Sequence, residues 1–168
     1  MSVDDTIFNV IKRNGNAEEV SFDKILKRVK TLCNESFVLH NIKYSQLVMK
    51  VIDQLFPNIS TTKIDELTAE QCASQCTKHP DYGELASRII ISNNQKNTPS
   101  TFYAAMEKLY HFTDSHGKHT PLIHEKLWNI TEKNKDKIEE MINYNRDFLI
   151  DYFGFKTLER AYLMKVNN

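Results

Sequence analysis

The chain has 168 residues, of which 40% are apolar and 10% aromatic, enough for one domain with a hydrophobic core, or for one domain and a short second unit. Its 22 lysine and arginine residues balance its 22 aspartate and glutamate residues, so no overall field favours nucleic acid or an anionic membrane. No apolar run reaches the roughly 18 residues of a membrane span, and the first residues are acidic, unlike a signal peptide. We therefore expect a cytoplasmic globular protein that binds neither nucleic acid nor membrane, with its cysteines as free thiols.

A short β-hairpin is predicted near the start of the chain. An alternating, β-prone stretch runs into Asn14-Gly15, a strong hairpin signal because both residue types tolerate a positive φ angle. The return strand is expected around residues 18–20. Ser21 then has the side chain of a helix cap, and we predict a helix from there to about Cys33.

Three more amphipathic helices follow in the predicted order, which makes this region mainly α. The second begins after Ser45 and is ended by Pro57, because proline cannot continue a helix. The third begins at one of the hydroxyl-bearing residues 60–62, any of which can cap it. The fourth begins at Pro80 and fades near residue 94.

The best candidate for a domain boundary is the polar stretch NTPS at residues 97–100, whose proline cannot extend the preceding helix. We place residues 1–98 in a first domain and residues 99–168 in a second, helical segment. In that segment helices are predicted over residues 102–112, 124–133 and 136–142, followed by two short helices between residues 146 and 166.

A small anion pocket is one interpretation of Lys12 and Arg13, which lie just before the hairpin turn, together with Lys24 near a helix start. Charged side chains are usually solvated, so an exposed strand end without a ligand accounts for the same residues. Neither of the common glycine-rich phosphate loops is present in the sequence. A nucleotide would therefore have to be held by side chains and helix ends.

Two other groups of residues raise the question of a metal or a proton-transfer site. Cys72, Cys76 and His79 have a spacing that permits a zinc hypothesis, but a structural zinc site needs a fourth ligand, and buried cysteines commonly pack as small apolar residues. The histidines between residues 111 and 124 are irregularly spaced and have no paired carboxylate, which favours solvent-facing or helix-capping roles. No serine or cysteine lies in a recognisable nucleophile motif.

Several motifs resemble one family, and they occur in the same order. VIKRNG at residues 10–15 and FDKI at residues 22–25 resemble the opening of the ATP-cone. The ATP-cone is the regulatory nucleotide-binding domain of ribonucleotide reductases. Later segments of the large subunit of the eukaryotic-type class I enzyme resemble TKHPDY at 77–82, LASRI at 85–89, YNRDF at 144–148 and YFGFKTLER at 152–160. The resemblance extends over nearly the whole chain.

The resemblance implies a mainly α fold: an ATP-cone, made of a short β-hairpin and a four-helix bundle, followed by a helical segment that leads to a catalytic barrel. It implies ATP or dATP as an allosteric effector, accompanied by Mg²⁺. Cationic side chains of the site would form charge-assisted hydrogen bonds with the triphosphate. Asp65 could accept a hydrogen bond from the adenine amine, and Thr61 could form a hydrogen bond with a polar edge of the ligand. The residues implied to line the pocket are Lys12, Arg13, Glu18, Glu19, Val20, Ser21, Phe22, Asp23, Lys24, Thr61, Asp65 and Lys96.

In this family the catalytic cysteines and the radical pathway lie beyond the last matched motif, so we expect no ribonucleotide reduction by this chain alone. The implied partners are the remainder of the large subunit and, through it, the radical-generating small subunit, in deoxyribonucleotide synthesis for DNA replication; self-association is left open. Without a barrel to cover it, the apolar face of the last segment would be exposed. That face consists of Phe148, Tyr152, Phe153, Phe155, Leu158, Tyr162 and Leu163.

Two further interpretations of the residues remain open. A stand-alone ATP-cone could act as a regulatory or docking module without reductase activity. An ATP-cone also occurs in a bacterial transcriptional repressor, where a zinc ribbon precedes it. Only a few residues precede the hairpin here, which argues against that version. A helical scaffold without a ligand should tolerate the loss of the Lys12 and Arg13 side chains.

Overall fold

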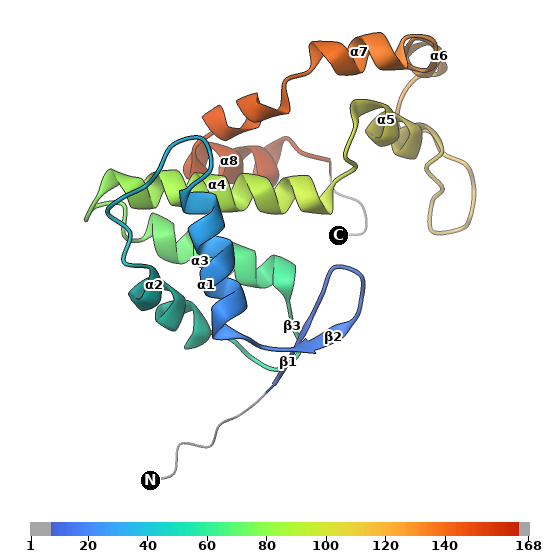
Figure 1. Cartoon of the computed structure of the whole chain (residues 1–168). Coiled ribbons are helices and arrows are strands. Elements are labelled where there is room, and N and C mark those ends of the chain that lie inside the picture. The colour runs from blue at the N-terminus through green and yellow to red at the C-terminus, as the bar shows by residue number, and fades with distance from the viewer. Residues whose placement is uncertain (1–7, 165–168) are drawn as a thin grey trace. The chain divides into compact units, whose positions relative to one another are not determined.

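The computed structural model describes residues 8–164, which divide into two compact units. The first comprises residues 8–93 together with 147–164, and the second comprises residues 94–146. The described residues are mainly helical and contain one three-stranded sheet (Figure 1), which confirms the predicted fold class. Among them, no helix is both long and apolar enough to cross a membrane.

The sheet has the strand order β2-β1-β3. Strands β1 (Asn9–Ile11) and β2 (Ala17–Glu19) form the predicted hairpin, in which Gly15 takes a φ angle of +83°. The third strand, β3 (Ile59–Ser60), pairs in parallel with β1 and was not predicted. A strand of two residues is too short to show an alternating pattern, so only its pairing with β1 reveals it.

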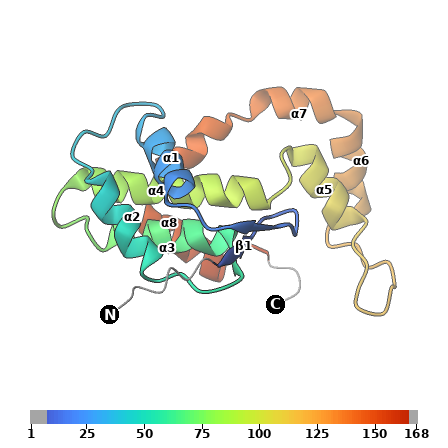
Figure 2. The ribbon, with the colours of Figure 1, turned by 60° about the horizontal axis from the view of Figure 1, so that its bottom comes forward.

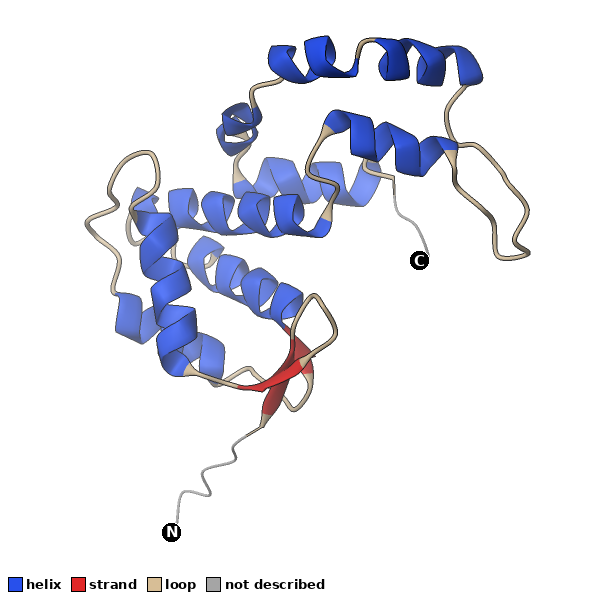
Figure 3. Cartoon of the chain, turned by 45° about the vertical axis from the view of Figure 1, so that its right-hand side comes forward, coloured by secondary structure: helices blue, strands red, loops and turns tan. Residues whose placement is uncertain are grey.

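Four helices complete the first domain: α1 (Phe22–Cys33), α2 (Tyr44–Ile52), α3 (Thr61–Ala73) and α4 (Pro80–Asn97). The side chains of Ser21 and Ser60 cap α1 and α3 by accepting backbone N–H groups three residues ahead. Helix α2 contacts both α1 and α3 (Figure 2) and ends before Pro57, so the proline is not the residue that stops it. The sheet covers one end of these helices (Figure 3).

Arg88 of α4 is almost completely buried and closes the end of α1. The last carbonyl groups of a helix have no partner within the helix, and they carry the negative end of its dipole. The Arg88 guanidinium lies over the ring of Phe37 and pairs with the carboxylate of Glu84. It also donates to carbonyl groups at and beyond the end of α1, namely those of Leu32, Cys33, Glu35 and Phe37.

The last described helix, α8 (Tyr152–Ala161), belongs to the same unit as the cone helices. It follows a 3₁₀ helix, η1 (Tyr144–Leu149), and is capped by Asp151. Phe155 is 3% exposed and lies in the same hydrophobic core as Leu85 and Ile89 of α4. The prediction that Phe155 would be exposed is therefore wrong, because the cone core itself offers an apolar surface to this helix. Three other residues of the predicted exposed face are partly buried, namely Phe148, Tyr152 and Leu158. Phe153, Tyr162 and Leu163 are exposed, as expected.

The second unit contains α5 (Phe102–Tyr110), α6 (Glu125–Lys133) and α7 (Lys135–Met141). Its packing is dominated by aromatic rings around the buried Trp128, which stacks on Tyr110 with 5.2 Å between ring centroids. His111 and His119 lie at the edge of this cluster. Glu139 of α7 accepts the first backbone N–H of α5.

Two of the three cysteines lie in the hydrophobic core, and all three are free, as expected. Burial raises the pKa of the Cys33 thiol from 9.0 to about 11, although nearby Arg88 opposes part of the shift. Burial also raises the pKa of the Cys72 thiol. Both thiols are therefore protonated at neutral pH and pack as small apolar groups.

We expect Phe155→Ala to destabilise the first unit by about 3–5 kcal/mol, because it removes a buried aromatic side chain and leaves a cavity. Phe153→Ala is the matched control: its ring is 64% exposed, and its loss should change stability by no more than about 0.5 kcal/mol. Urea unfolding followed by circular dichroism measures both. Equal effects of the two substitutions would contradict the placement of α8 on the core.

We expect a thiol reagent at neutral pH to modify Cys76 rapidly in the native chain, and Cys33 and Cys72 only after unfolding. Cys76 is partly exposed, whereas the other two are buried and held protonated. Titration with a chromogenic disulfide, before and after addition of guanidinium chloride, counts the reactive thiols. Cys76→Ser serves as the control and should abolish the native reaction; rapid modification of Cys33 or Cys72 in that variant would show that the core opens.

Candidate functional site

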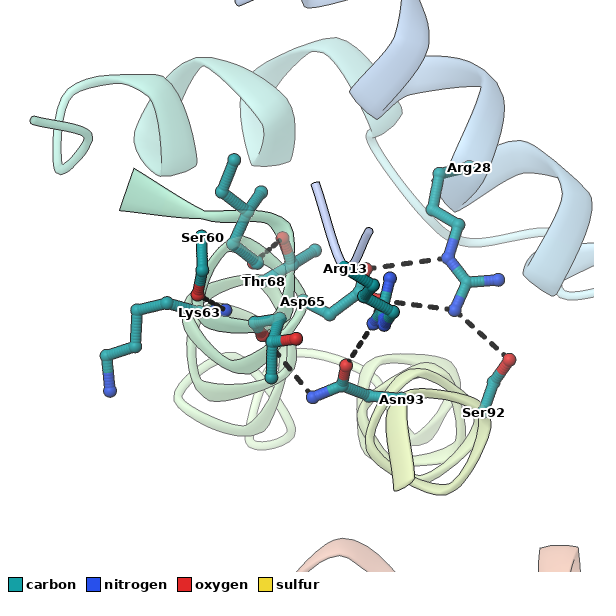
Figure 4. Close-up of polar contacts among 10 residues, drawn as sticks. Arg13, Arg28, Ser60, Lys63, Asp65, Thr68, Ser92 and Asn93 are labelled. Carbon is teal, nitrogen blue, oxygen red and sulfur yellow. Dashed lines mark hydrogen bonds and ion pairs between the residues drawn. The ribbon is translucent and has the colours of Figure 1, made fainter. Parts of the chain in front are cut away.

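A polar cluster around Asp65 joins the hairpin turn to three helices (Figure 4). Arg13 Nη2 lies 3.1 Å from Asp65 Oδ2, and it also donates to Asn93 Oδ1 of α4. Arg28 of α1 donates from Nε to Asp65 Oδ1 and from Nη2 to Asp65 Oδ2, both at 3.4 Å, and from Nη2 to Ser92 at 3.1 Å. Arg13, Asp65 and Arg28 are called the arginine triad below.

The Asp65 carboxylate is the centre of this triad and is only 8% exposed. A buried carboxylate is costly unless it is paired and hydrogen-bonded, and two guanidinium groups meet that need here. Asn93 extends the network, because its amide nitrogen donates to the Thr62 carbonyl in the first turn of α3. The triad thus connects residues that are far apart in the sequence at one carboxylate.

A second cluster lies at the hairpin and the first turn of α1. Glu18 of β2 pairs with both Lys12 and Lys24, and these three residues are called the lysine triad below. The lysine side chains are 45% and 66% exposed, so water reaches both ammonium groups. Exposed ion pairs contribute little to stability, and they leave the ammonium groups free to exchange partners.

Each triad contains two cations and one carboxylate, so each has a surplus positive charge. The hairpin turn supplies Lys12 to one triad and Arg13 to the other, and α1 supplies Lys24 and Arg28 in the same way. The structure therefore brings together four cations from two short segments. An anion with several charges is the natural ligand of such an arrangement.

The other sequence-predicted residues between β2 and α1 have structural roles or are exposed. Val20 and Phe22 are partly buried against the hydrophobic core, and Ser21 caps α1. Glu19 and Asp23 are exposed, at the end of β2 and in the first turn of α1.

Thr61 is the first residue of α3, next to the capping Ser60 and close in sequence to Asp65. Lys96 lies in the last turn of α4, beyond the residues of the first unit. Its approach to the two triads therefore stays a prediction.

Sequence reasoning missed Arg28, Ser92 and Asn93. Arg28 belongs to none of the motifs quoted above, although it follows Lys24 by four residues and so shares a helix face with it. That spacing is the signal that could have identified Arg28. Nothing in the local pattern distinguishes Ser92 or Asn93 from the other polar residues near the end of α4.

Several of the cysteines and histidines considered for a metal or proton-transfer site contribute to packing or to helix capping. Cys72 is buried in the core, and His79 Nδ1 accepts the backbone N–H of Asp81 at the start of α4. His124 caps α6 in a similar way, and the His119 ring bonds the Tyr110 carbonyl. Within residues 8–164, no group of three or more histidine, cysteine, aspartate or glutamate side chains has the geometry to hold a metal ion.

Comparison with known proteins shows to which family these residues belong. Residues 8–97 match the model of the ATP cone domain. The chain is 46% identical over 160 residues to the ribonucleoside-diphosphate reductase large subunit of monkeypox virus, and 44% identical over 163 residues to that of Danio rerio. The large subunit of Caenorhabditis elegans is 43% identical over 159 residues.

These alignments cover 94–95% of this chain but only 20–21% of each relative, so the chain spans about one fifth of the length of the reductase subunits that it matches. The matched domain contains both triads and the helices that carry them. The chain therefore belongs to the ATP-cone family, and it is similar over nearly its whole length to the cone-bearing amino-terminal region of ribonucleotide reductase large subunits.

Proposed function

We propose that the cone binds ATP or dATP as an allosteric effector, with the triphosphate held by the arginine and lysine triads. The observation that carries the proposal is the gathering of four cations, from the hairpin and α1, around the two carboxylates of Glu18 and Asp65. Phosphate oxygens form short, charge-assisted hydrogen bonds with guanidinium and ammonium groups. A triphosphate can therefore replace the carboxylates as partner of these side chains.

The two triads differ in how they would take part. Lys12 and Lys24 are largely exposed and can move toward a ligand, whereas Arg13 and Asp65 are held by the network that includes Asn93. Mg²⁺ would enter with the triphosphate, because this ion is usually bound through substrate phosphates and its own water molecules. The proposal therefore requires no separate metal cage in the protein.

We propose the residues that contact the adenine base from their chemistry and from the family resemblance. Thr61 and Asp65 offer a hydroxyl group and carboxylate oxygens near the start of α3, and these suit the polar edge of the base. Asp65 already accepts from two arginines, so a bond to an adenine amine would use its remaining lone pairs. Glu19 and the first turn of α1 complete the proposed pocket, and Lys96 stays a ligand that only the resemblance predicts.

The activity of the whole reductase is a further part of this proposal, because the chain spans only one fifth of its relatives. We propose that the cone acts on the remainder of a ribonucleoside-diphosphate reductase large subunit and, through it, on the small subunit. Effector control of that kind requires the ligand to bind two states of the assembly with different affinity. The cone with residues 1–98 would then be the sensor, and residues 99–168 would connect it to the rest.

We expect the Lys12→Ala/Arg13→Ala double variant to bind ATP and dATP on the order of 100-fold more weakly than the wild type, because one cation is lost from each triad. Isothermal titration calorimetry measures both affinities. The control is Lys27→Ala/Lys50→Ala, which removes the same charge from exposed positions on α1 and α2 and should bind like the wild type.

Circular dichroism must show that the wild type and both variants are folded. A folded wild type that binds neither nucleotide would contradict the proposal and would favour a docking module or scaffold without a ligand. Equal loss in the two double variants would show that binding responds to overall charge rather than to the triads.

A further inference from the structure

We propose that Arg28 is an additional phosphate ligand of the effector site, which Asp65 holds until the phosphate groups of a nucleotide draw it away. The inference rests on the proposed nucleotide-binding function and adds to it a residue that neither motif nor resemblance identified. Three features of the structure carry it: the unequal grip of Asp65 on the two arginines, the accessibility of Arg28, and its position between the triads.

Asp65 holds Arg28 less closely than it holds Arg13. The two contacts from Arg28 to the carboxylate are both 3.4 Å, whereas Arg13 Nη2 is 3.1 Å from the same Oδ2 atom. Charge-assisted bonds between nitrogen and a carboxylate are typically about 2.7–2.9 Å long. Asp65 is therefore shared between two guanidinium groups, and its contacts with Arg28 are the longer ones.

Arg28 also has a donor that is available to a ligand. Its side chain is 24% exposed, close to the 29% of Arg13, and within residues 8–164 its Nη1 atom donates to no other residue. Figure 4 shows this nitrogen turned away from Asp65. A phosphate group carries more charge than a carboxylate and can accept two parallel bonds from a guanidinium fork, so it competes favourably for this side chain.

The position of Arg28 on α1 places it where a ligand of the lysine triad can reach it. Lys24 and Arg28 are four residues apart and lie on the same face of the helix. An elongated anion bound to Lys24 therefore extends along the helix toward Arg28. A triphosphate has the required length and charge, whereas a single small anion needs only one of the triads.

The test compares Arg28→Gln with Lys27→Gln, which removes a charge from the exposed neighbouring position of α1. Calorimetry with ATP and with inorganic tripolyphosphate as separate probes should show affinities about tenfold weaker for Arg28→Gln and unchanged for Lys27→Gln. The same factor is expected for both probes, because the lost contact is to phosphate and not to adenosine. Arg28→Lys should recover part of the affinity, since lysine keeps the charge but lacks the fork.

Binding of ATP by the wild type separates this inference from the function on which it rests. Absence of that binding overturns both. If the wild type binds and Arg28→Gln behaves like Lys27→Gln, or weakens ATP without weakening tripolyphosphate, then Arg28 is not a phosphate ligand and the proposed function stands. If circular dichroism shows that Arg28→Gln is unfolded, Arg28→Lys decides: a severalfold loss with both probes supports the inference, and wild-type affinity overturns it.

Discussion

One buried carboxylate, shared by two arginines, holds the hairpin and the helices of the cone in register. Asp65 is shielded from water, so its charge must be balanced by groups that reach it from other elements. Arg13 comes from the hairpin turn and Arg28 from α1, and both also bond residues of α4. Loss of any one of these three side chains would leave a buried charge with fewer partners, so the triad links the position of the hairpin to that of the helices.

Helix α4 is the frame on which these elements are aligned. Arg88 donates to the last carbonyl groups of α1. One turn further along α4, Ser92 accepts a hydrogen bond from Arg28, and Asn93 accepts one from Arg13. The alignment of α1 with α4 therefore also determines where Arg28 can lie. A buried arginine with several carbonyl partners is specific in geometry, since each bond of its planar group has a fixed direction.

Much of the local structure follows from short-range chemistry in the sequence. The Asn14-Gly15 turn, the serine caps of α1 and α3, and the apolar faces of the helices are each encoded within a few residues, and the structure has all of them. The candidate anion site was found in the same way, from adjacent charges at Lys12 and Arg13. Strand β3 was not predicted from the sequence because a strand of two residues shows no alternating pattern.

What the sequence by itself determined is the mainly α character, the hairpin, most helices and the charged residues of the hairpin turn, since all of these depend on neighbours along the chain. Only the tertiary structure decided that Arg28 shares Asp65 with Arg13, that Asn93 joins them, and that Phe155 enters the cone core. The contacts of the arginine triad and Asn93 link residues that are 37 to 80 positions apart in the sequence. Their existence depends on burial and on the alignment of whole helices, which no local pattern of residues specifies.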